Sequence, residues 1–196
     1  MAAKSSLTNM ALCLTAVCLV CSAILGVVYA VTYDPIQAAA QKALEESISA
    51  VLPEGGELSP NGISSDAEGV DEYYVLSNGG APVAYAVKST TMGFGGALTV
   101  MVGVLPDGTV YNTSVLAHSE TPGLGAKCAD AASSFREQFK NFKGSLKVTK
   151  DGGDVDAITA STITSRAFTK AVAQAVACVA ALGQGATNVE EEPSNE

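Results

Sequence analysis

The sequence predicts an α+β protein, with a transmembrane helix and a stalk helix at the N-terminus and one domain in which an antiparallel sheet packs with helices. Three observations predict it. Residues 7–33 carry no charged side chain, later segments alternate apolar and polar residues at the period of a strand, and an alanine-rich helical pattern precedes an acidic tail. A chain of 196 residues has room for one modest domain beside these segments.

The first apolar segment is long enough to cross a membrane. As a helix, residues 10–31 would extend roughly 33 Å, against a hydrocarbon core of about 30 Å. Lys4 precedes the segment and Asp34 follows it, so the positive-inside tendency places residues 1–9 in the cytoplasm and the domain outside. A cleaved signal peptide ending at residues 28–30 is the alternative, but its apolar region should span only about 7 to 15 residues.

The cysteines do not indicate a metal or redox site. Cys13, Cys18 and Cys21 lie in the apolar segment, where one helix supplies neither a polar setting nor four converging ligands. We expect them to be small packing residues. Cys128 and Cys178 stand apart in the rest of the chain, and their spacing leaves open whether they form a disulfide.

A stalk and a loop are expected at residues 32–70. Asp34 as an N-cap and Pro35 at the first helical position predict a helix start. This helix should run to Leu52, before Pro53, and should continue from the membrane helix. The residues after it are polar and rich in turn formers, which is typical of a loop.

The domain is expected at residues 71–182, followed by an acidic, disordered tail at 183–196. The predicted elements are strands at 72–77, 83–90, 97–105 and 109–117, a helix at 129–142, a short strand at 146–148 and a last helix ending near 182. Turn residues separate the four strands, and the alternation of apolar side chains predicts an antiparallel sheet with one buried face.

Composition argues against two classes of function. The chain has 20 acidic and 11 basic residues and a formal charge of -9, so it offers no basic surface for a nucleic acid. It has one histidine, His118, and no GxSxG, HExxH or P-loop motif. Because a nucleophilic hydroxyl needs an adjacent base, the sequence does not indicate a self-sufficient hydrolytic enzyme, and it predicts no metal site.

Residues 156–172, DAITASTITSRAFTKAV, gather hydroxyl groups around one acid immediately before the last helix. The hydroxyls belong to Thr159, Ser161, Thr162, Thr164 and Ser165. Capping of the free N–H groups in the first helical turn explains one or two of them, with Asp156 favoured by the helix dipole. The same helix end is also suited to hold a phosphate.

This stretch resembles the flavinylation motif of the FMN-binding domain family. The matching residues are Asp156, Thr159, Ala160, Ser161, Thr162 and Thr164. The resemblance implies that Thr164 carries FMN through a phosphoester bond. It also implies that a separate flavin transferase makes this bond from FAD, so that the chain needs no base of its own. Ala160 and Ser161 stand where the family usually has glycine and alanine.

A second resemblance lies about forty residues upstream. HSETPGLGAK, residues 118–127, is similar to a segment of the G subunit of the Rnf ferredoxin:NAD oxidoreductase and of its relative, the C subunit of the sodium-pumping NADH:quinone reductase. GFGGALTVMVGV, residues 93–104, resembles a strand of the same subunits. The resemblance implies that Glu120, Thr121, Gly123, Leu124 and Gly125 belong to the FMN site, the glycines by letting the backbone approach the flavin. The alternative is that these residues only form a turn and do not contact FMN.

Taken together, the resemblances imply an electron-transfer subunit of an Rnf-type ion-translocating complex, which is not an autonomous enzyme. Its partners would be membrane and iron-sulfur subunits and the flavin transferase. It would span the bacterial inner membrane once, with its FMN domain on the extracytoplasmic side. The alternatives are a subunit of a sodium-translocating NADH:quinone reductase, a flavin-binding sensor or regulatory module, and a scaffold domain that is never flavinylated.

Overall fold

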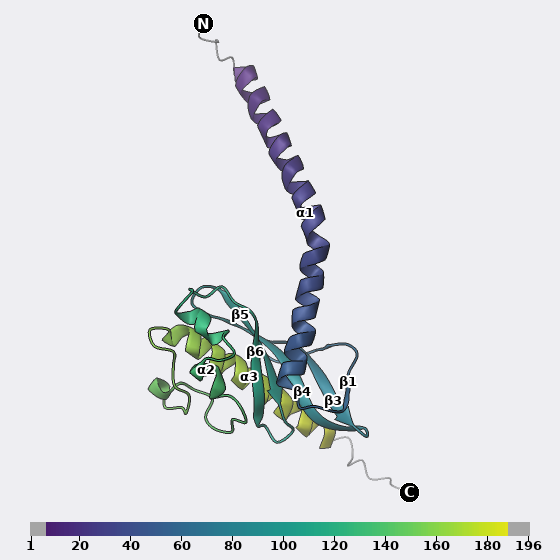
Figure 1. Ribbon diagram of the computed structural model, residues 1–196, viewed down its shortest axis with the longest axis vertical. Helices are drawn as coiled ribbons and strands as arrows, with labels where there is room; N and C mark the ends of the chain where they lie inside the picture. Colours follow the sequence, from purple (N-terminus) through teal and green to yellow (C-terminus); the bar gives the residue numbers. More distant parts are fainter. Residues whose placement is uncertain (1–6, 188–196) are drawn as a thin grey trace. The chain divides into compact units, whose positions relative to one another are not determined.

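The chain begins with one long helix. The computed structural model describes residues 7–187, and α1 runs without interruption from Leu7–Val51 with Pro35 inside it (Figure 1). The separate helix start predicted at Asp34 and Pro35 is wrong, because the preceding apolar run already forms helix and Pro35 falls in its interior. There it removes one backbone hydrogen bond, and its ring crowds the preceding turn. The predicted continuity of membrane helix and stalk is confirmed.

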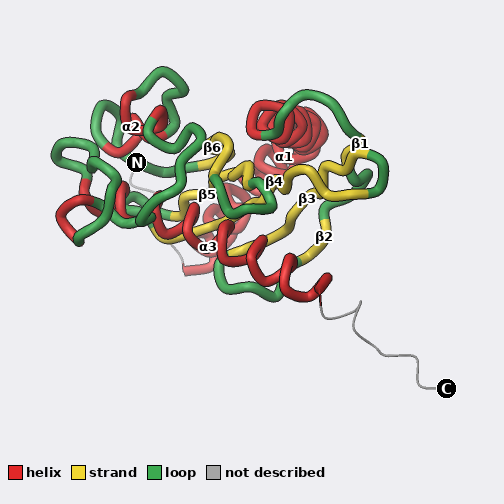
Figure 2. The backbone as a smooth tube through the Cα atoms, turned by 90° about the horizontal axis from the view of Figure 1, so that it is seen from below, coloured by secondary structure: helices red, strands yellow, loops and turns green. Residues whose placement is uncertain are grey.

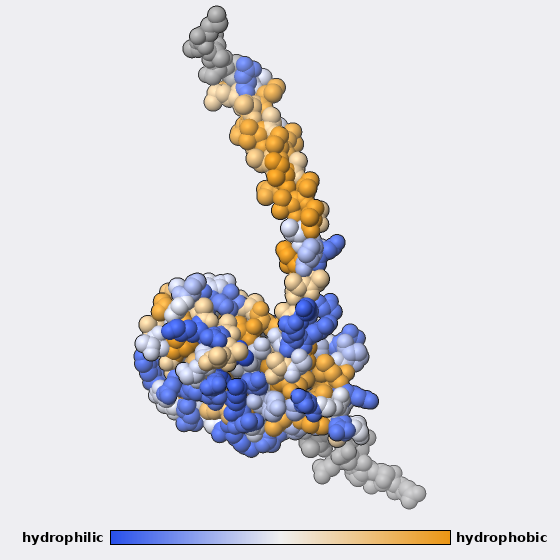
Figure 3. Space-filling model, in the orientation of Figure 1, coloured by the Kyte–Doolittle hydropathy of each residue, from blue (hydrophilic) through white to orange (hydrophobic). Residues whose placement is uncertain are grey.

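The N-terminal two thirds of α1 present an apolar surface all round. Large side chains such as Leu12, Val20 and Leu25 are more than half exposed, and Figure 3 shows the resulting apolar band along the helix. Among the described residues, α1 is the one helix that is long and apolar enough to cross a membrane. Residues 1–6 of the predicted cytoplasmic segment lie outside the described part of the chain.

A single antiparallel sheet forms the centre of the domain, as predicted. Its path is β1-β3-β4-β5-β6, with β2 paired to β3 (Figure 2). The strands are β1 (Glu57–Leu58), β2 (Ile63–Ser64), β3 (Val70–Asn78), β4 (Ala81–Met92), β5 (Ala97–Val104) and β6 (Val110–Ala117). The four predicted strands are therefore confirmed, and β1 and β2 form within the segment that was expected to be loop.

Both faces of this sheet are covered, whereas the alternation predicted one buried face. On one face, Val87, Val100 and Val102 pack against the last helix, α3 (Thr162–Thr187). On the other face, Ala86 and Met101 join a smaller apolar cluster. The second face is buried because the end of α1 packs on it through Ile48, Val51 and Leu52. Figure 2 shows the strands between the two helices.

Gly103 permits this second packing layer. A Cβ atom at Gly103 would lie 1.8 Å from the carbonyl oxygen of Val51, so the last turn of α1 contacts the β5 backbone directly. The small residues Ala84 and Ala86 on the neighbouring strand are fully buried beneath the same helix. A glycine and two alanines therefore make the depression in which the end of α1 lies.

The segment between β6 and α3 is mostly irregular. It contains η1 (Gly125–Cys128), the one-turn helix α2 (Ser134–Glu137) and η2 (Thr149–Asp151). The helix predicted at 129–142 is wrong in extent, and the strand predicted at 146–148 is reduced to one parallel bridge between Val148 and Val155. Aromatic side chains, more than helical periodicity, hold this segment in place.

Four phenylalanines attach the irregular segment to α3. Phe135 and Phe139 have ring centroids 5.2 and 4.9 Å from that of Phe168, and Phe142 packs on Phe139 at 6.1 Å. The rings are tilted or edge to face, as favoured for aromatic pairs. Because Phe168 lies in α3, this cluster fixes the segment against the helix that carries the hydroxyl-rich motif.

The last helix extends beyond its predicted end near residue 182, to Thr187. Residues 188–196 of the predicted tail lie outside the described part of the chain. The contacts within the chain form two units, residues 1–43 and 44–196, so the end of α1 packs as part of the domain. The α+β architecture with an N-terminal apolar helix is confirmed.

Replacing Gly103 with alanine tests the packing of α1 on the sheet. We expect Gly103→Ala to lower the free energy of unfolding by about 1–3 kcal/mol, because the new methyl group has no space beside the Val51 carbonyl. The measurement is denaturant unfolding of the full chain in detergent. Gly183→Ala is the matched control, since nothing lies within 4 Å of its added Cβ. Equal stability of Gly103→Ala and the native chain would contradict this packing.

Candidate functional site

A glycine-rich turn between β4 and β5 binds the carboxylate of Glu120. The backbone N–H of Phe94 donates to Glu120 Oε1 at 2.8 Å, and that of Gly95 donates to the same oxygen at 3.4 Å. A Cβ at Gly93 would lie 2.1 Å from Oε1, and one at Gly95 would lie 2.0 Å from the Ser119 carbonyl oxygen. These glycines therefore do more than reverse the chain, because they let two loops meet around one carboxylate.

The second oxygen of Glu120 contacts the hydroxyl-rich motif. Thr164 Oγ1 donates to Glu120 Oε2 at 2.8 Å, which joins residues 44 positions apart in the chain. Thr164 is 1% exposed and Glu120 is 6% exposed. Gly125 lies against both, and a Cβ there would be 2.5 Å from Oε2 and 2.7 Å from Oγ1. Glu120 and Thr164 thus form a buried pair that depends on the absence of a side chain at Gly125.

Ser165 shapes the turn that leads into α3. Its hydroxyl donates to the Ser161 carbonyl and accepts from the Ile158 N–H, both at 2.9 Å. Ala160, between them, has a φ angle of +61°, in the left-handed region that favours glycine. This left-handed conformation explains why the flavinylation motif usually has glycine at this position. In this chain an alanine adopts it.

A pocket of about 390 Å³ opens beside Thr164. Its lining residues come from the β4–β5 turn, the loop after β6 and the start of α3. They are Phe94, Glu120, Thr121, Leu124, Gly125, Ala160, Ser161, Thr162, Ile163 and Thr164. Phe94, Leu124 and Ile163 are 69%, 44% and 51% exposed, so the pocket combines a polar floor with an apolar rim.

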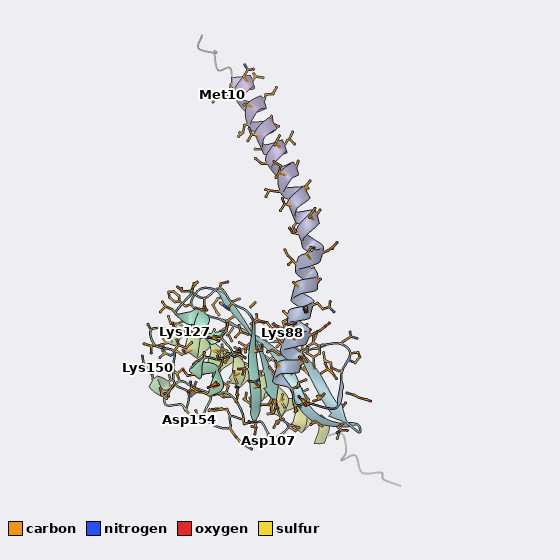
Figure 4. All side chains as sticks on the ribbon, in the orientation of Figure 1. Met10, Lys88, Asp107, Lys127, Lys150 and Asp154 are labelled. Atoms are coloured by element: carbon orange, nitrogen blue, oxygen red, sulfur yellow. The ribbon has the colours of Figure 1, made fainter. Side chains whose placement is uncertain are left out.

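One basic side chain, Lys150 from η2, contacts a residue of the pocket lining. Lys150 Nζ donates to Thr162 Oγ1 at 3.4 Å, and in the view of Figure 4 Lys150 lies at the edge of the domain. Arg166 makes two hydrogen bonds to the Asp151 carboxylate, at 2.6 and 2.7 Å. These bonds hold the pKa of Asp151 below its ordinary value. The ion pair attaches η2 to the first turns of α3, which positions Lys150.

The thiols of the domain are buried and free. Burial, and then the charge of Glu120, raises the pKa of the Cys128 thiol to about 11, so this thiol stays protonated and unreactive at neutral pH. Cys178 is also buried, and its sulfur lies 3.5 Å from the Ser65 hydroxyl oxygen. The structure therefore answers the question that the sequence left open, since Cys128 and Cys178 do not pair.

The structure brings most of the predicted binding residues together. Those that line the pocket are Glu120, Thr121, Leu124, Gly125, Ala160, Ser161, Thr162 and Thr164. Three lie outside its lining. Asp156 is exposed and exchanges two backbone hydrogen bonds with the Gln138 side chain, Thr159 is exposed, and Gly123 occupies a turn with φ of +78°. Contact of any of these residues with a cofactor stays a prediction.

Sequence reasoning missed three residues of the site. Phe94 lies within the segment 93–104 and Ile163 within the hydroxyl-rich motif, and both line the pocket, but neither was predicted as a site residue. Lys150 reaches Thr162 from η2, a segment for which the sequence analysis predicted no role in the site. The sequence also gave no sign that Glu120 contacts Thr164. The implication that the chain needs no base of its own stays a prediction.

The pocket fits a flavin mononucleotide in size and chemistry. Its volume falls in the range of small-molecule sites, about 300–1,000 Å³. Exposed apolar side chains at the rim suit a flat aromatic ring. The N-terminus of α3, a helix of 26 residues, presents free N–H groups to an anion. Among the ionisable side chains in the described part of the chain, Glu120 alone lines the pocket.

Two protein-family models match this chain. Residues 93–177 match the model of the FMN-binding domain family, and residues 1–51 match that of the RnfG N-terminal region. The chain is therefore an FMN-binding domain with an N-terminal membrane anchor. The chain belongs to the RnfG family, the G subunits of ion-translocating oxidoreductase complexes.

Relatives in this family cover most of the chain. It is 36% identical over 167 residues to the G subunit of the proton-translocating ferredoxin:NAD(+) oxidoreductase complex of Clostridium ljungdahlii, covering 83% of this chain and 86% of the relative. It is 34% identical over 176 residues to the G subunit of the ion-translocating oxidoreductase complex of Shewanella baltica, covering 81% and 82%. The crystal structure of the C subunit of a Na(+)-translocating NADH-quinone reductase from Parabacteroides distasonis aligns with a TM-score of 0.42, 24% identity and coverage of 63% and 65%.

Replacing Ala160 with glycine tests the strained turn before α3. The left-handed conformation costs a non-glycine residue roughly 1–2 kcal/mol. Glycine avoids this cost, but its larger conformational entropy in the unfolded state offsets part of the gain. We expect Ala160→Gly to raise the free energy of unfolding by about 0.5–1 kcal/mol, measured by denaturant unfolding. Ala173→Gly, within α3, serves as the control and should lower it by about 1 kcal/mol. A loss of stability in both variants would refute the strain.

Proposed function

We propose that this chain is the electron-transfer subunit of a membrane-bound, Rnf-type ion-translocating oxidoreductase and carries FMN covalently on Thr164. The observation that carries the proposal is the buried Thr164 hydroxyl, which lies in the first turn of α3 at the floor of the pocket. The family match supports FMN as the bound group. Covalent attachment and the complex that the chain joins are the proposed part.

The start of α3 supports attachment at this position. A phosphate on Thr164 would lie at the N-terminal end of a long helix, where free N–H groups and the helix dipole favour an anion. Lys150, held at the Thr162 hydroxyl, would add a positive charge on the same side. Ser161 and Thr162 also line the pocket and would offer hydrogen bonds to phosphate oxygens.

The apolar residues at the rim of the pocket are suited to hold the isoalloxazine ring of FMN. Phe94, Leu124 and Ile163 expose apolar surface around the opening, and covering that surface with a flavin would remove it from water. Thr121 would offer a hydrogen bond to the ring edge. Bound FMN supplies reversible one- and two-electron chemistry, while the protein orients the ring and adjusts its electronics.

The proposed arrangement in the membrane follows from α1. Residues 10–31 would span the bacterial inner membrane once, with residues 1–9 in the cytoplasm and the FMN-binding domain, residues 71–182, on the extracytoplasmic side. On that side a covalent tether would prevent loss of the flavin by dilution. A separate flavin transferase would load it, and membrane and iron-sulfur subunits of the complex would exchange electrons with it.

Replacing Thr164 tests the attachment site. We expect Thr164→Ala to abolish covalent flavin, because no other hydroxyl of the motif is hydrogen-bonded to a carboxylate in the described structure. The measurement is flavin fluorescence of the full chain in a denaturing gel, after production in a host that contains the flavin transferase.

The matched control is Thr162→Ala, which removes a hydroxyl from the same helical turn and should keep the fluorescence. Thr164→Ser, which retains a hydroxyl, should keep it as well. Undiminished fluorescence of Thr164→Ala would rule out Thr164 as the attachment site.

A further inference from the structure

We propose that the loop of residues 118–125 is a lid that covers Thr164 and has to open before the flavin transferase attaches FMN. This inference rests on the proposed function and adds to it the step that controls access to the site. In the described structure Thr164 is 1% exposed, and Glu120, which accepts its hydrogen bond, is 6% exposed. A hydroxyl buried in this way cannot reach a phosphorus atom that a separate enzyme holds.

Two contacts close the lid over Thr164. Its hydroxyl donates to Glu120 Oε2 at 2.8 Å. The backbone of Gly125 lies against the same hydroxyl, since an added Cβ would be 2.7 Å from Thr164 Oγ1. Thr164 also lines the pocket, but its small exposed fraction means that the pocket alone does not open the hydroxyl to a bulky reagent. Movement of the loop away from α3 would remove both contacts and expose the hydroxyl.

The lid has little buried surface of its own. Of its eight residues, Glu120 and Gly125 are buried and the other six are exposed. Its turn is closed by local hydrogen bonds, in which the N–H groups of Leu124 and Ala126 donate to the Thr121 carbonyl oxygen at 3.2 Å. These bonds can persist when the loop moves as one piece. Segments with few buried contacts open locally at much lower cost than the core, so the loop is suited to act as a lid.

Glu120 is the residue that holds the lid closed. Its Oε1 accepts hydrogen bonds from the N–H groups of Phe94 and Gly95, and its Oε2 accepts from Thr164. Hydrogen bonds to an ionised acceptor are stronger than those between neutral groups, and a buried carboxylate without donors would be costly. Opening requires the separation of Oε2 from Thr164, so a change that weakens the contacts of this carboxylate should favour the open form.

Attachment of FMN prevents the lid from returning to this closed contact. Thr164 Oγ1 forms a bond to the phosphorus of the FMN half of FAD, the pyrophosphate bond breaks with its electron pair leaving on AMP, and the hydroxyl proton is released. Oγ1 then has no hydrogen to donate to Glu120. The phosphodiester also carries a negative charge, which repels a neighbouring carboxylate. The contact between Glu120 and Thr164 therefore belongs to the unmodified chain.

The test is the rate at which flavin transferase labels the folded full chain in detergent. The chain is produced without covalent flavin in a host that lacks the transferase, then mixed with FAD and purified transferase, and gel fluorescence follows the covalent flavin. We expect Glu120→Ala to be labelled about 10–100 times faster than the native chain, because the loss of a hydrogen bond to a charged group raises the open population by roughly that factor. Thermal unfolding shows whether the variant is folded.

Two milder variants decide the question if Glu120→Ala does not fold. Glu120→Gln keeps the shape of the side chain but removes the charge, so it should be labelled faster than the native chain and more slowly than Glu120→Ala. Gly95→Ala keeps the carboxylate and displaces the loop, because the added Cβ would lie 2.0 Å from the Ser119 carbonyl oxygen, and it should also be labelled faster. Gly183→Ala, whose added Cβ has nothing within 4 Å, is the control and should keep the native rate.

The outcomes distinguish this inference from the proposed function. Folded variants that are labelled at or below the native rate would overturn the lid and leave the proposed attachment standing. Labelling that occurs only after the chain is denatured, and in none of the folded variants, would do the same, because FMN would then be attached before folding. A native chain that carries no covalent flavin when purified from its own host would overturn the attachment and the inference together.

Discussion

The hydrogen bond between Thr164 and Glu120 is the contact on which the site depends. It joins the start of α3 to the loop after β6, and through the other oxygen of Glu120 it joins both to the β4–β5 turn. A carboxylate buried without partners would be costly. Its three hydrogen-bond donors use both oxygens of Glu120, and through them the carboxylate joins the three segments that surround the pocket.

The rest of the fold holds these three segments in place. The sheet supplies β4, β5 and β6, whose ends carry two of the loops, while α3 packs across one face and carries the third. The end of α1 covers the opposite face. Two glycines make these contacts possible, because a side chain at either position would collide with its neighbours. Gly103 lets the end of α1 pack on the sheet, and Gly125 lets the Glu120–Thr164 pair form.

Local patterns in the sequence predicted much of this architecture. The strands β3 to β6, the final helix and the apolar helix were recognisable from periodicity and turn residues, and the motifs identified most of the residues that line the pocket. Periodicity failed where contacts between distant segments determine the structure. Residues 129–142 form only one helical turn, and their phenylalanine rings pack on Phe168 of α3. Likewise, Met101 is buried because the end of α1, about fifty residues earlier in the chain, covers it.

The role of Glu120 illustrates the same limit. Its segment and that of Thr164 were each recognised, but a contact over 44 positions is not encoded in either motif alone. Intact-mass analysis with peptide fragmentation of the protein purified from its native host tests the central claim most directly. We predict one FMN, bound through phosphate to Thr164. An unmodified chain, or FMN on a different residue, would contradict it.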